Sequence, residues 1–250
     1  MTGRLTVAGL GPGRGDWCIP QVLDRLTEAT DVVGYRPYLD QIPVPITARR
    51  YGSGNRVETD RAALALDLAE AGGAVVVVSS GDPGVFAMAT AIVECLDAAP
   101  DRWTGVAVEV LPGISAAHAL ASRVGAPLGH DFCVVSLSDV LKPWELIERR
   151  IDAAAGADFV LAFYNPTSRH RPWQLGRALE IVATHRAPTT SVVIGRNVAR
   201  DSETVRVVDL AAVDPQEIDM STILIVGSSM TRVVRGRGLA TSVYTPRQHP

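Results

Sequence analysis

The residues best suited to chemistry form a turn, Ser79-Ser-Gly-Asp-Pro-Gly84, that directly follows four consecutive valines. A run of β-branched apolar residues is typical of a strand buried on both faces, as in a parallel sheet. Open α/β sheets bind ligands outside the carboxyl ends of their strands, and Gly81 and Gly84 would let a ligand approach the backbone there. The apolar pattern from Val85 to Ile92 predicts a helix after the turn. Asp82 suits two roles, a cap of that helix or an acceptor for a polar ligand. A purely structural turn between strand and helix explains the same residues.

Two further stretches have small residues where a predicted strand ends. They are Gly9-Leu-Gly-Pro-Gly13 and Leu111-Pro-Gly-Ile-Ser-Ala116. The first resembles the dinucleotide fingerprint G-x-G-x-x-G, but Arg14 stands at the position of the third glycine. Pro12 also lacks the N–H group that a phosphate would use. The stretch therefore predicts a tight, ligand-facing loop that does not bind NAD.

The elements that must position these turns alternate along the chain, which predicts an α/β protein. We expect two α/β/α domains with mixed sheets, residues 1–120 and 121–250, and a cleft between them lined by strand-end loops. Residues 126–129 are the predicted linker. Helices are predicted over 19–28, 57–71, 143–155 and 173–185, a basic loop over 49–56, and an antiparallel strand over 204–208.

The composition excludes several classes of protein. With 250 residues, 47% of them hydrophobic, and a net charge of −3, the chain offers no signal for a nucleic-acid or membrane partner. Cys18, Cys95 and Cys133 are odd in number and far apart, so we expect no disulfide, no metal site and a reducing, cytoplasmic location. Lys142 is the only lysine among the 24 basic residues, and arginine binds carboxylates bidentately. Codon bias explains the arginine content equally well.

Four stretches, taken in their order along the chain, resemble the motifs of the tetrapyrrole methylase family. They are Gly9–Gly13, Ser80–Gly84, Leu111–Ala116 and Ser221–Gly227. Three further stretches are similar to one branch of that family: Gly34–Leu39, Gly129–Asp139 with Pro143-Trp144, and Tyr164–Ser168 with Arg171. The resemblance implies S-adenosyl-L-methionine-dependent methylation of precorrin-3B at C-17, with ring contraction to precorrin-4, in cobalamin biosynthesis. It also implies a homodimer.

The resemblance further implies that the cofactor, S-adenosyl-L-methionine, lies folded between the domains. Carried over by position, its contacts in the first domain would be Gly81, Asp82, Val85, Phe86, Ser115 and Ala116. In the second domain they would be Tyr164, Asn165, Ser221, Thr222 and Ile223. Phe86-Ala87 stands where the family frequently has tyrosine-glycine. This departure would change the shape of the apolar wall of the cofactor site.

The implied substrate is a small-molecule tetrapyrrole with many carboxylates, so basic residues on loops gain a role. Gly11, Pro12 and Gly13 would border the tetrapyrrole, and the candidate contacts for its acidic arms are Tyr35, Arg36, Arg49, Arg50, Arg169 and Arg171. Each of these arginines also suits a surface position without function. Ring contraction would gain from a general base, for which Asp139, His130 and Asp131 are candidates by position, with a structural role as the alternative for each.

Other functions fit parts of this pattern. A different precorrin position or a cobalt-loaded substrate stays within the family. A relative that methylates ribosomal RNA would need a basic stripe interleaved with aromatic residues, which the sequence lacks. A nucleotide-binding module without catalysis would keep the glycine loops but would need no arginines for carboxylates.

Overall fold

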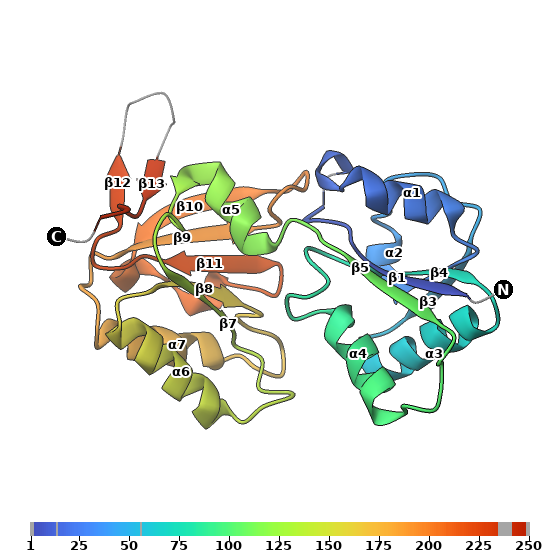
Figure 1. Ribbon diagram of the computed structural model, residues 1–250. Coiled ribbons are helices and arrows are strands. Elements are labelled where there is room, and N and C mark those ends of the chain that lie inside the picture. Colours follow the sequence, from blue (N-terminus) through green and yellow to red (C-terminus); the bar gives the residue numbers. More distant parts are fainter. Residues whose placement is uncertain (1–2, 14, 56, 235–241, 249–250) are drawn as a thin grey trace. The chain divides into compact units, whose positions relative to one another are not determined.

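The computed structural model describes residues 3–13, 15–55, 57–234 and 242–248 (Figure 1). The chain divides into two compact units, with the boundary between Ser115 and Ala116. The boundary predicted at residue 120 lies inside helix α5 (Ala116–Val124), which packs against β11 (Thr222–Val226) and β13 (Ser242–Tyr244). Because a helix forms as one hydrogen-bonded element, all of α5 belongs to the second unit. None of the helices described is long and apolar enough to cross a membrane.

The first unit is built on a five-stranded sheet of order β3-β2-β4-β1-β5, in which each pairing is parallel. Its strands are β1 (Arg4–Gly9), β2 (Asp31–Tyr35), β3 (Arg49–Ser53), β4 (Ala74–Ser79) and β5 (Ala107–Leu111).

The four valines occupy β4, the central strand of this sheet, and alternate between two apolar cores. Val75 and Val77 pack with α3 (Glu58–Glu70) and α4 (Met88–Ala98). Val76 and Val78 pack on the other face with α1 (Pro20–Glu28) and the short α2 (Arg36–Leu39) (Figure 1). Successive strand residues point to opposite faces, so a central strand that is covered on both sides needs an unbroken apolar run.

The second unit contains a five-stranded sheet of order β10-β9-β11-β8-β7. Only the β7–β8 pairing in it is parallel, and β10 is antiparallel to β9 as the sequence predicted. Helices α6 (Trp144–Gly156) and α7 (Gln174–Ala183) cover one face (Figure 1). Its other strands are β7 (Phe132–Ser136), β8 (Val160–Tyr164), β9 (Ser191–Arg196) and β10 (Thr204–Asp209).

A small third sheet, β12-β13-β6, completes the second unit, with β12 at Arg232–Val234 and β6 at Gly125–Ala126. Three short 3-10 helices lie at Gly15–Trp17, Leu210–Ala212 and Pro215–Glu217. The predicted α/β class is confirmed. The mixed sheets lie in the second unit, whereas the first sheet is parallel in all its described pairings.

Three local predictions were wrong. Residues 49–53 form edge strand β3 rather than a loop, because Tyr51 packs on the core while Arg49 and Arg50 are exposed, as charged residues are on an edge. The expected linker begins with β6, which pairs with β13. Helix α4 starts at Met88, so Val85 belongs to the preceding turn and not to the helix.

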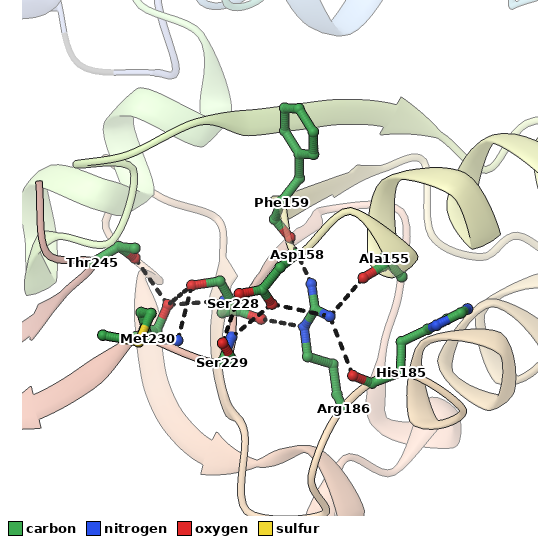
Figure 2. Close-up of polar contacts among 11 residues, drawn as sticks. Ala155, Asp158, Phe159, His185, Arg186, Ser228, Ser229, Met230 and Thr245 are labelled. Carbon is green, nitrogen blue, oxygen red and sulfur yellow. Dashed lines mark hydrogen bonds and ion pairs between the residues drawn. The ribbon is translucent and has the colours of Figure 1, made fainter. Parts of the chain in front are cut away.

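A buried arginine, Arg186, connects chain segments at the ends of strands in the second unit's main sheet (Figure 2). Arg186 donates hydrogen bonds to the carbonyl oxygens of Ala155 (2.6 Å), Phe159 (3.0 Å) and Gly227 (3.3 Å). It also forms an ion pair with Asp158, at 3.1 Å between Nη1 and Oδ1. One planar guanidinium thus joins the chain entering β8 to the chain leaving β11.

Three glycines bring the ends of β1, β4 and β5 into backbone contact. A Cβ atom on Gly9 would lie 2.6 Å from the carbonyl oxygen of Gly81 and 2.8 Å from the Cα of Gly113. A Cβ on Gly113 would overlap the same Gly81 oxygen. Gly9 and Gly113 can therefore approach the Gly81 carbonyl only because neither of them has a side chain.

We expect Gly113→Ala to lower the free energy of unfolding by about 1–3 kcal/mol, since the added methyl group must displace backbone atoms. Gly54→Ala is the matched control, because a Cβ there has no heavy atom within 4 Å. Denaturant unfolding of both variants measures the difference. Equal stabilities would contradict the close approach of the three loops.

Candidate functional site

The two glycine loops of the first unit are joined by their backbones. Gly11 N–H donates to the Gly81 carbonyl at 3.2 Å, and Gly81 N–H donates to the Gly11 carbonyl at 2.7 Å. Both glycines have positive φ values, 73° and 69°, which a side chain would disfavour. The structure thus brings together the segments around Gly11–Gly13 and Gly81–Gly84 that the sequence singled out.

Asp82 ties these loops to the third one. Its Oδ1 accepts a hydrogen bond from the Gly84 N–H (2.8 Å), and its Oδ2 accepts one from the Gly113 N–H (3.1 Å). The alternative that Asp82 caps α4 is wrong, because the N-cap position is Ala87 and no side chain bonds there. Each carboxylate oxygen keeps a further lone pair for a ligand.

Phe86 is held in an unusual conformation between this turn and α4. Its φ is 52°, in the left-handed region, and its side chain is 49% exposed. A bulky residue in this region costs on the order of 1–3 kcal/mol, and such residues cluster at ligand sites. Val85 closes the turn by donating to the Asp82 carbonyl at 3.3 Å.

A buried arginine that the sequence did not single out lies at this edge. Arg61, in the first turn of α3, donates to Ser53 Oγ (2.8 Å) and to the Gly54 carbonyl (2.6 Å), and it contacts Met88 Sδ (3.3 Å). Burial lowers the pKa of its guanidinium. Arg61 follows two acids in an exposed helix start, so nothing in the sequence distinguished it from a surface residue.

The three arginines of the first unit that the sequence did single out lie at opposite ends of the parallel strands. Arg36 directly follows β2, is exposed and stays beside Tyr35, whose ring meets Tyr38 edge to face at 5.2 Å between centroids. Arg49 and Arg50 begin β3, at the amino edge of the parallel sheet, away from the glycine loops.

Arg49 already has a partner there, the carboxylate of Asp31, at 2.9 Å between Nε and Oδ1. Burial raises the pKa of Asp31, but hydrogen bonds from Thr30 and Arg49 outweigh that effect and hold it below its usual value. Arg49 and Arg50 are the first residues of β3, so the length of that strand separates them from the glycine loops. The prediction that they lie beside those loops is therefore corrected.

In the second unit, Tyr164 and Asn165 lie where β8 ends. The Tyr164 hydroxyl accepts a hydrogen bond from the Ala117 N–H (2.8 Å), one of the free donors at the start of α5. Asn165 has φ 51°, and its Nδ2 donates to Ser136 Oγ at 2.9 Å. The ends of β7 and β8 and the start of α5 thus meet at one edge. Ser115 ends the first unit and Ala116 begins this helix.

Ser221 and Thr222 belong to the same edge, where β11 begins, and are held by Asp219. Asp219 Oδ1 accepts from the Ser221 N–H and from Thr222 Oγ1, each at 2.9 Å, and its Oδ2 accepts from Arg196 Nε at 2.8 Å. Burial raises the pKa of Asp219, but these bonds hold it below its usual value.

Ile223 is buried within the strand, so the backbone is what it has to offer a ligand. Asn197 N–H donates to the Ser221 carbonyl at 2.9 Å, which adds the end of β9 to this edge. The sequence-based selection missed Asp219 and Asn197, because no motif marks either of them.

Two neighbouring arginines of the β8–α7 loop differ in their surroundings. Arg171 is buried, and its Nη1 donates to the carbonyls of Leu137 (3.2 Å) and Asn165 (3.1 Å). It thus connects the ends of β7 and β8 from inside, and its contact with substrate stays a prediction. Arg169 is exposed at the tip of the turn closed by Ser168 and Arg171.

The candidate bases lie at both ends of β7, with Asp139 after the strand and His130 and Asp131 before it. Asp139 follows that strand, at the edge of Tyr164, and its Oδ2 accepts from Gln174 Nε2 at 3.0 Å. His130 and Asp131 precede β7, so about five residues of strand at roughly 3.3 Å each separate them from that edge. Of the three candidates, Asp139 is the one that follows β7, and the role of each as a base stays a prediction.

A cavity of about 90 Å³ lies at that opposite edge, beside the Arg186 cluster (Figure 2). Its lining includes His130, Asp131, Asp158, Ser228 and Met230. Asp158 is already bonded to Arg186 and to the N–H and hydroxyl of Ser229. The described residues contain no group of three or more His, Cys, Asp or Glu that could hold a metal ion.

Comparison with protein-family models matches residues 4–214 to the Tetrapyrrole (Corrin/Porphyrin) Methylases. The chain belongs to the tetrapyrrole methylase family. The resemblance based on the four ordered motifs is thereby confirmed.

Relatives of this tetrapyrrole methylase have been named for their activity. A Sinorhizobium sp. protein, precorrin-3B C(17)-methyltransferase, is 47% identical over 247 residues, which cover 99% of this chain and 97% of that protein. Cobalamin biosynthesis protein CobIJ of Mycobacterium tuberculosis (strain ATCC 25618 / H37Rv) is 54% identical over 100% of this chain but 49% of its own length. The chain thus spans about half of that relative.

Solved structures agree with the fold. The crystal structure of the methyltransferase CobJ matches with a TM-score of 0.91 and 48% identity, over 98% of this chain and 100% of that chain. A uroporphyrin-III C-methyl transferase from Thermus thermophilus, complexed with S-adenyl homocysteine, matches with a TM-score of 0.67 at 24% identity, over 90% of this chain and 92% of that chain. The second match shows the shared fold.

We expect Arg171→Met to lower the free energy of unfolding of this methylase by at least about 2 kcal/mol, because two buried carbonyls lose their donor. Arg169→Met, two residues away and exposed, should change it by less than about 0.5 kcal/mol. Thermal and denaturant unfolding of the pair measure the contrast. If the free energy of unfolding of Arg171→Met were unchanged, the role of Arg171 in joining β7 and β8 would be contradicted.

Proposed function

We propose that this chain catalyses S-adenosyl-L-methionine-dependent methylation of precorrin-3B at C-17, with ring contraction to precorrin-4, in cobalamin biosynthesis. The observation that carries the proposal is the 47% identity to the Sinorhizobium precorrin-3B C(17)-methyltransferase over nearly the full length of both chains. The 48% identity and TM-score of 0.91 to CobJ support the same branch of the family.

The two edges described above carry groups that suit S-adenosyl-L-methionine. The first unit offers exposed backbone at Gly84, the Asp82 carboxylate and the half-exposed Phe86 ring. The second offers Tyr164, Asn165 and the backbone of 221–223, with Ser115 and Ala116 at the unit boundary. The bound cofactor would supply an electrophilic methyl group on a sulfonium.

The protein's own part in the reaction is alignment. The macrocycle provides the carbon nucleophile, so no nucleophilic side chain is required, and positioning two reactants can be worth roughly 7–11 kcal/mol. Loops locked by backbone contacts and a strained turn at Phe86 suit that task. Asp139 is the proposed group for receiving a proton during ring contraction, since it follows β7 at the edge of Tyr164.

Tyr35, Arg36, Arg169 and the loop of Gly11, Pro12 and Gly13 are the proposed substrate contacts. The proposal includes a cytoplasmic homodimer. The dimer rests on the family resemblance, and the compartment rests on three free cysteines.

A cobalt-loaded substrate is the second candidate. The probable cobalt-factor III C(17)-methyltransferase of Salmonella typhimurium is 37% identical to this chain, and the cobalt-factor III methyltransferase of Priestia megaterium is 43% identical. The higher identity to the Sinorhizobium precorrin-3B C(17)-methyltransferase, 47%, favours the metal-free substrate.

Incubation with precorrin-3B and S-adenosyl-L-methionine should yield a product one methyl group heavier, with the absorption spectrum of a contracted ring. Mass spectrometry and absorbance follow the reaction, and a cobalt-loaded precorrin serves as the competing substrate. Turnover of the cobalt complex alone would move the chain to the second candidate. If the protein binds the cofactor but methylates no tetrapyrrole, the enzyme proposal is contradicted and a nucleotide-binding module is favoured.

We expect Asp82→Ala to weaken S-adenosyl-L-methionine binding at least about tenfold, because it removes a charged hydrogen-bond acceptor. The variant should remain folded but less stable, since Gly84 and Gly113 lose the acceptor of their N–H groups. Isothermal titration calorimetry measures the affinity. Asp97→Ala, an exposed acid on α4, is the control. An unchanged affinity in Asp82→Ala would remove Asp82 from the cofactor site.

A further inference from the structure

The second unit exposes four large apolar side chains on the loops around Asp139 and Arg171. They are Val140 (53% exposed), Leu141 (97%), Trp173 (51%) and Met220 (47%), which we call the apolar rim. In the described part of the second unit, every exposed large apolar residue belongs to this rim. Exposed apolar groups gathered in one region mark interaction sites.

Contacts from buried residues hold these loops in place. Gln174, which follows Trp173, donates from Nε2 to Asp139 Oδ2 at 3.0 Å, and the Trp173 ring meets Trp144 edge to face at 5.0 Å. Arg171 reaches Met220, at 3.4 Å between Nη2 and Sδ, while it holds the Leu137 carbonyl. The rim is therefore presented by a fixed frame, as a preorganised binding surface requires.

One buried acceptor in this frame lacks a donor. Gln174 is 2% exposed, and its Oε1 has no hydrogen-bond partner among the described residues, although its Nε2 is satisfied by Asp139. That oxygen is closed to the surface, so a group docked on the rim does not reach it.

Two cationic side chains border the rim. Lys142 follows Leu141 directly, and Arg169 is exposed on the turn that Ser168 and Arg171 close with two backbone hydrogen bonds of 3.1 and 2.9 Å. Asp139, the acid nearest in sequence to Val140, is bonded to Gln174. An occupant that matches this pattern has an apolar face and acidic groups at its periphery.

We propose that the apolar rim is the second unit's docking surface for the tetrapyrrole, with the macrocycle over Leu141 and Trp173 and its carboxylate arms toward Lys142 and Arg169. The inference rests on the proposed function for its substrate class. The rim is continuous with the edge of Tyr164, whose carbonyl accepts a hydrogen bond from the Leu137 N–H at 2.9 Å.

The first test is the variant Leu141→Ser, which should fold normally because the position is 97% exposed. We expect the KM for precorrin-3B and the Kd for the stable octacarboxylate probe uroporphyrin III to rise about tenfold, since the variant loses the apolar contact between the leucine and the macrocycle. The kcat and the affinity for S-adenosyl-L-methionine should stay unchanged. Val93→Ser, an exposed apolar residue of α4, is the matched control.

The second test uses the single lysine. Because the sequence contains one lysine, acylation of a lysine amine reports on Lys142 alone. Peptide mass spectrometry should show slower acylation of Lys142 when uroporphyrin III is bound, and no change with S-adenosyl-L-methionine alone. The amino terminus is the internal reference.

Two outcomes would overturn the inference. One is tetrapyrrole binding that leaves Lys142 acylation and the Leu141→Ser affinity unchanged. The other is a change of oligomeric state in Leu141→Ser at unchanged tetrapyrrole affinity, which would make the rim an interface between copies. If the probe protects Lys142 but the chain methylates no precorrin, the proposed function is refuted. The proposal that a tetrapyrrole docks on the apolar rim would still stand.

Discussion

The first unit depends on the close packing of Gly9, Gly81 and Gly113. Strands β1, β4 and β5 are neighbours in a parallel sheet, so their carboxyl ends reach the same edge, and residues without a Cβ allow the loops to touch. The backbone pair of Gly11 and Gly81 and the carboxylate of Asp82 then lock the three loops together. A ligand at this edge meets fixed backbone groups, which suits a reaction that depends on alignment.

The second unit reaches a similar result with side chains. Its β7, β8 and β11 segments are joined at the Tyr164 edge through long polar groups. The Tyr164 hydroxyl bonds the start of α5, the Arg171 guanidinium bonds the ends of β7 and β8, and Asp219 bonds the start of β11. Each bridging group is satisfied by more than one partner or by a free helix N–H, so its burial is compensated.

Arginine serves two purposes in this family member. Arg61, Arg171 and Arg186 are buried, and carbonyl or hydroxyl oxygens accept their N–H groups. Arg36 and Arg169 are exposed at the two candidate edges and stay available for acidic groups. An arginine-rich sequence therefore overstates the number of sites for an anionic substrate, because part of that content connects strand ends from inside the protein.

The sequence by itself determined the α/β class, most strands and helices, and the family, because apolar periodicity and glycine turns are local signals and four motifs stood in one order. It also selected the loops that meet through Gly11, Gly81 and Gly113. Tertiary structure alone decided which polar residues lie together at the strand ends and which are buried. Arg49 is at the wrong edge because β3 is a strand, Arg171 is buried because it bridges two strands, and Asp82 bonds a loop 31 residues away in sequence. Those outcomes depend on contacts between distant segments, which no local pattern encodes.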